Sequence, residues 1–137
     1  MAFRIAASQS AHDEAVRAAG EIYRDRGRHV WLNPDGEKNK EWGGFFADVI
    51  AAATPGSDPT WVVEVETEDS VSASEAKSQW AKYGDAYPSW CLAVPISQEE
   101  TARRLIREHG VEHCTVILWE KAPTGSHTFW GLPGLTG

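Results

Sequence analysis

The chain has 137 residues, with 20 acidic and 13 basic side chains, and its formal net charge is −7. The chain contains seven Trp, four Phe and three Tyr, and its composition is 42% hydrophobic. This composition argues against disorder, and the length suits one domain with its own core. The acidic balance excludes a protein that coats nucleic acid through general positive charge, because phosphate binding rests on clustered cations. A local basic groove or a metal-bridged contact to phosphate stays open.

The cysteines and the apolar segments bear on the compartment. Cys91 and Cys114 lie in apolar runs and form no CxxC pair, which is typical of a reducing, cytoplasmic setting. The first residues lack the sustained apolar core of a signal peptide, and no apolar stretch is long enough to span a bilayer. We therefore expect a soluble, cytoplasmic protein without a membrane partner.

Helix and strand signals alternate along the chain. Alanines at helical spacing after Ser10, a favourable N-cap residue, predict a first helix that Gly27 ends. Ser72 and Ser97 each precede a glutamate by three residues, which is the capping-box spacing of a helix start. The predicted elements are, in chain order, a helix over 10–26, strands over 29–32, 45–51 and 61–67, a helix from 72 to about 83 that Gly84 ends, a strand over 90–94, a helix from 97 to 110, and a strand over 115–119.

This order of elements predicts an α/β fold. The two late strands are continuous apolar runs flanked by helices, which implies parallel crossovers and a sheet covered on both faces. The three early strands are joined by polar turns, which suggests an antiparallel meander. We predict a mixed β-sheet sandwiched by helices in a single domain over 1–120, and a Gly- and Pro-containing tail over 121–137 that packs on the same domain or is partly disordered.

Acidic residues inside predicted strands are the unusual feature of the sequence. Glu64 and Glu66 point to the same side of their strand, because side chains alternate between the two faces. Asp48 shares a face with Phe46 and Ile50 on the preceding strand, so pairing of the two strands brings three carboxylates to one patch. A hard cation such as Mg²⁺ compensates for burying such a cluster. The alternative is a solvated, merely acidic strand end.

The helix after the acidic strand carries a polar strip. Gln79 and Tyr83 are four residues apart and share a helix face, and Lys82 lies close to it. We expect Gln79 and Tyr83 to face the Glu64 end of the sheet while Trp80 packs inward. The alternative is ordinary amphipathicity, in which the polar residues of this helix are solvated.

A strand aspartate, a strand Glu-x-Glu and a helical Gln-x-x-x-Tyr, in this order, resemble the PD-(D/E)xK nuclease superfamily of restriction-endonuclease-like proteins. The Gln-x-x-x-Tyr element is similar to that of its RecB-like branch. The resemblance covers about Ala11 to Trp119 and implies an αβββαβ core, here with an extra helix and strand.

The resemblance also implies roles for individual residues. Asp48 and Glu64 match the acidic motif positions and would hold the metal. Glu66 would occupy a second metal position or orient the attacking water. Gln79 and Tyr83 would position the phosphate or a displaced strand.

The sequence departs from the family pattern around the motif aspartate. Ala47 stands where the family usually has proline before Asp48. A literal Pro34–Asp35 pair exists, but its surroundings predict a turn, so Asp48 is the better match. Where family members have an acid on the first helix, Glu14 and Glu21 are both candidates.

The largest departure is at Glu66, where the family usually has lysine. Lys82 or Lys77, on the following helix, would supply the missing positive charge as a migrated cation. An acid near a strand end is expected to contribute little packing, so Glu66 is interpreted as a residue of the site rather than of the core.

The function that the resemblance implies is hydrolysis of phosphodiester bonds in DNA by a Mg²⁺- or Mn²⁺-dependent endo- or exonuclease. The alternative is a catalytically inactive restriction-endonuclease-like fold that binds nucleic acid or protein, which the acidic charge and Glu66 favour. No DNA-reading module is recognisable in the sequence, so a homodimer or a DNA-binding partner protein is also expected.

Overall fold

The structure is a computed structural model that describes residues 6–135. Its elements are α1 (Ala6–Asp25), β1 (His29–Leu32), β2 (Val49–Ala52), β3 (Trp61–Val65), α2 (Ala73–Glu75), the π-helical turn η1 (Ala76–Trp80), α3 (Ala81–Ala86), β4 (Trp90–Pro95), the 3₁₀ turn η2 (Ile96–Gln98), α4 (Glu99–Glu108), β5 (Cys114–Lys121) and β6 (His127–Trp130). The predicted order of elements is confirmed, and β6 is an additional strand that was not predicted from the sequence.

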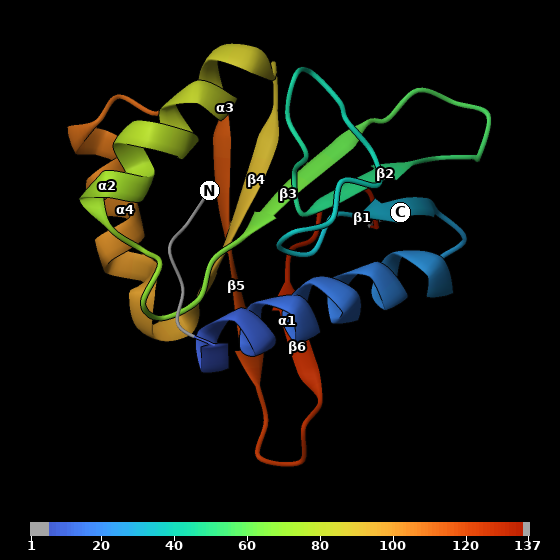
Figure 1. Cartoon of the computed structure of the whole chain (residues 1–137), viewed down its shortest axis with the longest axis horizontal. Coiled ribbons are helices and arrows are strands. Elements are labelled where there is room, and N and C mark those ends of the chain that lie inside the picture. The colour runs from blue at the N-terminus through green and yellow to red at the C-terminus, as the bar shows by residue number, and fades with distance from the viewer. Residues whose placement is uncertain (1–5, 136–137) are drawn as a thin grey trace.

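The six strands form one mixed sheet in the order β1-β2-β3-β4-β5-β6. The first three strands and the last pair are antiparallel, whereas β3, β4 and β5 run parallel. The predicted early meander and late parallel crossovers are therefore both present. The helix α1 lies along one side of the sheet, and α2, α3 and α4 gather on the other (Figure 1).

Two hydrophobic cores hold these layers together. The first lies between α1 and one face of the sheet, and its α1 contribution is Ala15, Val16, Ala19 and Tyr23. The second lies between the opposite face and the later helices, and it includes Trp80, Tyr83, Leu92 and Leu105. Each central strand is buried on both faces, as expected for strands of a covered parallel sheet.

The first helix ends as predicted but begins earlier. Gly27 has φ +78, and the amides of Gly27 and Arg28 donate to the carbonyls of Arg24 and Tyr23, which is the glycine-terminated helix end. Ser10 lies inside the helix and not at its N-cap. Alanines before Ser10 explain the difference, because alanine has the highest helix propensity.

The segment before β2 is a loop where a strand was predicted. Gly43 and Gly44 have positive φ values of 66 and 92, and the turn that they form brings Trp42 and Phe45 into an isolated bridge. Pairing with β1 and β3 begins only at Val49. The predicted strand over 45–51 is therefore wrong in its first half.

The helix after β3 starts where predicted and runs further. The Ser72 hydroxyl accepts the Glu75 amide at its N-terminus, but Gly84 lies within α3 and does not end it. A Cβ at Gly84 would be 2.8 Å from backbone atoms of Glu112, so glycine serves the close approach of two backbone segments. Ser97, the other predicted cap, instead donates its hydroxyl to Glu68, and a 3₁₀ turn leads into α4.

The C-terminal segment is ordered by contacts with the domain. The strand β6 pairs with β5, and the Tyr23 hydroxyl donates to the Pro133 carbonyl at 2.7 Å. Arg28 Nε donates to the Gly134 carbonyl at 3.0 Å. None of the helices within residues 6–135 has both the length and the apolar character that crossing a bilayer requires.

Candidate functional site

Asp48 and Glu64 meet at the ends of two neighbouring strands. The antiparallel register pairs Val49 with Val63, which sets Asp48, one residue before β2, opposite Glu64 on β3. The Asp48 amide donates to Glu64 Oε1 at 3.2 Å, and the Val65 amide donates to Asp48 Oδ2 at 2.8 Å. The backbone of each strand therefore fixes the carboxylate of the other.

Gln79 and Tyr83 hold the second oxygen of Glu64. Gln79 Nε2 donates to Glu64 Oε2 at 3.0 Å, and the Tyr83 hydroxyl donates to the same oxygen at 3.3 Å. Gln79 Nε2 also lies 3.0 Å from the Tyr83 hydroxyl. The structure thus brings both helix residues to Glu64, as their spacing predicted, while Trp80 is buried.

Glu66 occupies a different environment. It is fully buried, and it accepts hydrogen bonds from the Ser70 hydroxyl at 2.6 Å and from Trp80 Nε1 at 2.9 Å. It does not line the cavity that Asp48 and Glu64 share. The expectation that Glu66 contributes little packing is therefore wrong, because Ser70 and Trp80 enclose its carboxyl group.

Glu64 and Glu66 favour the protonated forms of their carboxyl groups. Burial, followed by the charges of Asp48 and Glu66, raises the pKa of Glu64 well above its ordinary value. Burial, followed by the charge of Glu75, raises the pKa of Glu66 to about 8. For both groups, desolvation is a larger cause of the raised pKa than repulsion from neighbouring carboxylates.

Two further residues of the site come from distant segments. His12 is buried on α1, and its Nε2 lies 3.0 Å from Asp48 Oδ2. Its Nδ1 lies 3.1 Å from Asp13 Oδ1 and 3.6 Å from Asp35 Oδ2. One ligand atom from each of His12, Asp35 and Asp48 can be chosen so that all three lie within 4.8 Å of one another.

His12 was not predicted as a site residue, and Asp35 was interpreted as part of a turn rather than as the motif aspartate. His12 falls on the buried stripe of α1, one helical turn before Ala15 and Val16, and a polar residue on such a stripe was the available signal. Asp35 does lie in a turn, as predicted, but its amide donates to Asp13 Oδ1 at 3.2 Å, and this contact folds the turn toward the site.

The candidate acids on the first helix lie elsewhere. Glu14 Oε1 is 2.7 Å from Lys121 Nζ, and Glu21 Oε1 is 3.0 Å from Arg24 NH1. Both glutamates are exposed. Neither lines the cavity at Asp48, so α1 contributes His12 to the site.

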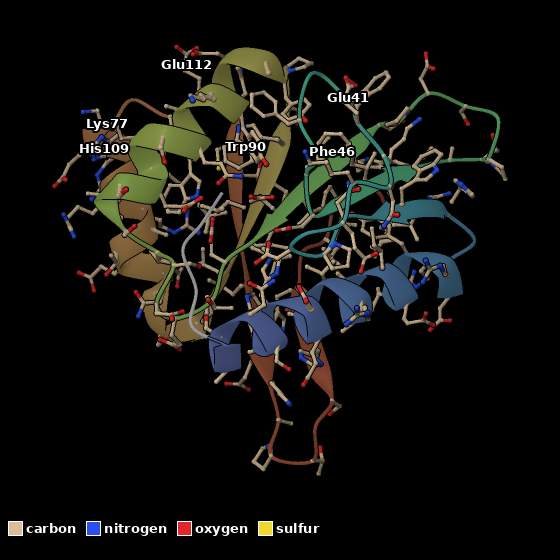
Figure 2. All side chains as sticks on the ribbon, in the orientation of Figure 1. Glu41, Phe46, Lys77, Trp90, His109 and Glu112 are labelled. Atoms are coloured by element: carbon tan, nitrogen blue, oxygen red, sulfur yellow. The ribbon has the colours of Figure 1, made fainter. Side chains whose placement is uncertain are left out.

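The lysines proposed to replace the motif lysine do not reach the cavity. Lys77 and Lys82 are exposed and are not among its lining residues. In the view of Figure 2, Lys77 lies over the helices on the left, away from the loop that carries Phe46. The cavity instead contains Lys38, from the loop between β1 and β2. The expected role of Lys82 is therefore not supported by its position.

The cavity has a volume of about 250 Å³. Asp48, Glu64, Gln79 and Tyr83 line one side, and the other side comes from the loop over 33–46. Gln79 Oε1 is buried and has no hydrogen-bond partner within residues 6–135. A hydrogen-bond donor on a ligand or on a bound water would satisfy this atom.

Comparison with known proteins gives no relative. No family model, no curated protein and no solved structure matches the chain. The functional assignment therefore rests on the geometry and chemistry of the site.

Proposed function

We propose that the protein hydrolyses phosphodiester bonds in DNA with the help of Mg²⁺ or Mn²⁺, at the cavity formed by Asp48 and Glu64. The observation that carries the proposal is the pairing of these two carboxylates at adjoining strand ends, with Glu64 held by Gln79 and Tyr83. An αβββαβ order with acids at these positions resembles the restriction-endonuclease-like core, and it supports the same proposal.

The residues present suit a hard divalent cation. Asp48 and Glu64 offer carboxylate oxygens, which Mg²⁺ and Mn²⁺ prefer, and Asp35 and His12 offer a further oxygen and an imidazole nitrogen beside them. Buried neighbouring carboxylates repel each other, and a cation would compensate for that cost. Asp48 and Glu64 both line the cavity, and each of them is 5% exposed.

The residues of the site would have separate roles in hydrolysis. Asp48 and Glu64 would hold the cation, and the chemistry that a bound cation would supply is polarisation of a phosphate oxygen and a lower pKa of a water molecule. Gln79 and Tyr83 fix the orientation of the Glu64 carboxylate, and the Val65 amide fixes Asp48. Lys38 supplies positive charge for the phosphate in place of the motif lysine.

A second candidate function is a binding module without catalysis. Glu66 occupies the position at which the family has lysine, and it is enclosed rather than directed into the cavity. A fold with this arrangement would bind nucleic acid or protein without cleaving it. Cytoplasmic location and a homodimer or DNA-binding partner belong to either proposal.

Calorimetry with Mg²⁺ and Mn²⁺, followed by a cleavage assay on single-stranded and duplex DNA, separates the two functions. We expect the wild type to bind metal and cleave, and Asp48→Asn to lower cleavage about a hundredfold or more, because charge stabilisation at the reacting phosphate is lost. Asp58→Asn, in the exposed loop between β2 and β3, is the matched control and should change neither. A wild type that neither binds metal nor cleaves would contradict hydrolysis and favour the binding module.

A further inference from the structure

An aromatic side chain is presented to solvent at the rim of the candidate site. Phe46 is 39% exposed and lines the same cavity as Asp48 and Glu64. Figure 2 shows it on the loop between β1 and β2, on the same side of the molecule as Glu41. The other large hydrophobic residues exposed within residues 6–135, Ile96 and Trp130, do not line this cavity.

The loop that carries Phe46 is held in place by Asn33. Asn33 Nδ2 donates to the carbonyls of Lys40 and Ala47 at 2.9 and 2.8 Å, and Asn33 Oδ1 accepts the amides of Asn39 and Lys40. One buried side chain therefore connects both ends of the loop. Phe46 is exposed on a fixed support, so its exposure does not result from a loose segment.

A positive charge accompanies the ring. Lys38 Nζ lies 5.6 Å from the centroid of Phe46. Beneath them, the Phe45 ring packs edge-on against Tyr83, with centroids 4.9 Å apart, which joins the loop to the helix that orients Glu64. A flat apolar face, an ammonium group and the proposed catalytic carboxylates thus lie around one opening.

The charge of the chain decides which form of DNA suits this opening. Duplex recognition depends on many cations along the phosphate backbone, whereas the formal net charge here is −7. Within residues 6–135, Lys38 is the only cation that lines the cavity. Base stacking on an aromatic ring is a contribution that cations do not supply, and it is available to an unpaired base because that base offers a free face.

We propose that Phe46 and Lys38 form a subsite for an unpaired DNA nucleotide, whose base stacks on Phe46 while Lys38 contacts its phosphate. The substrate is then single-stranded DNA or a single-stranded end. This inference rests on the proposed function, because it places the strand beside the same carboxylates. The base displaces Lys38 from the ring, since an exposed cation–π contact is weaker than base–aromatic stacking.

Fluorescence anisotropy without metal tests the subsite independently of cleavage. The probes are an end-labelled oligothymidine and a duplex of the same length, both in EDTA. We expect tighter binding of the oligothymidine, and a loss of about tenfold to a hundredfold in its affinity for Phe46→Ala. Phe46→Trp should retain the affinity, and Trp130→Ala, which removes a 48% exposed ring elsewhere, should leave it unchanged.

The salt dependence tests the role of Lys38. One phosphate contact to a single strand predicts that the logarithm of the affinity falls with the logarithm of salt concentration with a slope of about −0.7, and Lys38→Met should bring this slope close to zero. Four outcomes would each overturn the subsite. The wild type could bind duplex and oligothymidine equally, bind oligouridine more tightly than oligothymidine, or bind no oligonucleotide. Phe46→Ala could also bind the oligothymidine as tightly as the wild type does. Binding that depends on Phe46 without cleavage in Mg²⁺ or Mn²⁺ would overturn hydrolysis alone, whereas cleavage that does not depend on Phe46 would overturn the subsite alone.

Discussion

Glu64 and Glu66 differ in surroundings although they lie two residues apart and point to the same side of the sheet. Glu64 borders the cavity and is held by an amide and a phenol from the covering helix. Glu66 lies deeper, where a hydroxyl and an indole enclose it. Alternation along a strand fixes the face of a side chain, but the helix packed above the strand decides whether that side chain meets solvent.

The π-helical turn produces this division. Gln79 and Trp80 are adjacent in η1, and they donate to Glu64 and Glu66 respectively. The wider turn, in which the Ala81 amide donates to the Ala76 carbonyl, allows consecutive residues to serve the two carboxyl groups. Such turns are frequent at functional sites.

Removing the enclosed carboxyl group should have the largest effect on stability. Glu66→Ala leaves a small cavity and the Trp80 indole donor without its acceptor, so we expect a loss of about 3 kcal/mol in the free energy of unfolding. Glu64→Ala should cost much less, because water can enter from the cavity and replace the lost contacts. Urea denaturation measures both values, and equal losses for the two variants would remove the distinction between the two glutamates.

The pH dependence of stability should sharpen the same comparison. The pKa of Glu66 rises from 4.5 to about 8 on folding, so the folded state binds more protons between these values and its stability falls as pH rises through that window. Across two pH units inside the window, the wild type should lose about 2 kcal/mol relative to Glu66→Gln. Urea midpoints for both proteins at several pH values measure the difference, and parallel pH profiles would contradict the raised pKa.

The smallest effect is expected at Tyr83. Tyr83→Phe removes a 3.3 Å hydrogen bond to Glu64 but keeps the ring, which packs edge-on against Trp90. Glu64 retains Gln79, so stability should fall by less than about 1 kcal/mol. Gln79→Leu should lower the metal affinity more than Tyr83→Phe does, because it removes the shorter of the two hydrogen bonds to Glu64 Oε2. Calorimetry measures both metal affinities. A larger loss for Tyr83→Phe would show that the phenol is the main support of Glu64.

Local signals in the sequence predicted most of the sheet and part of the candidate site. Runs of β-branched and apolar residues predicted β1, β3, β4 and β5, and alternation predicted that Asp48 and Glu64 converge. Long-range contacts were not predictable in this way. His12 contacts Asp48 across the fold, and Gly84 is required because the backbone of Glu112 lies close to it. The short strand β6 forms by pairing with β5.

Tyr23 on α1 and Pro133 in the C-terminal segment are 110 positions apart in the chain, yet they are joined by a hydrogen bond. The entropic cost of closing a loop grows only slowly with the length of the loop. The Tyr23–Pro133 contact therefore costs little more conformational entropy than the same contact across a shorter loop. Contacts of such large sequence separation slow folding. We therefore expect the C-terminal segment to dock after α1 has packed on the sheet, because the contact needs residues from both ends of the described chain.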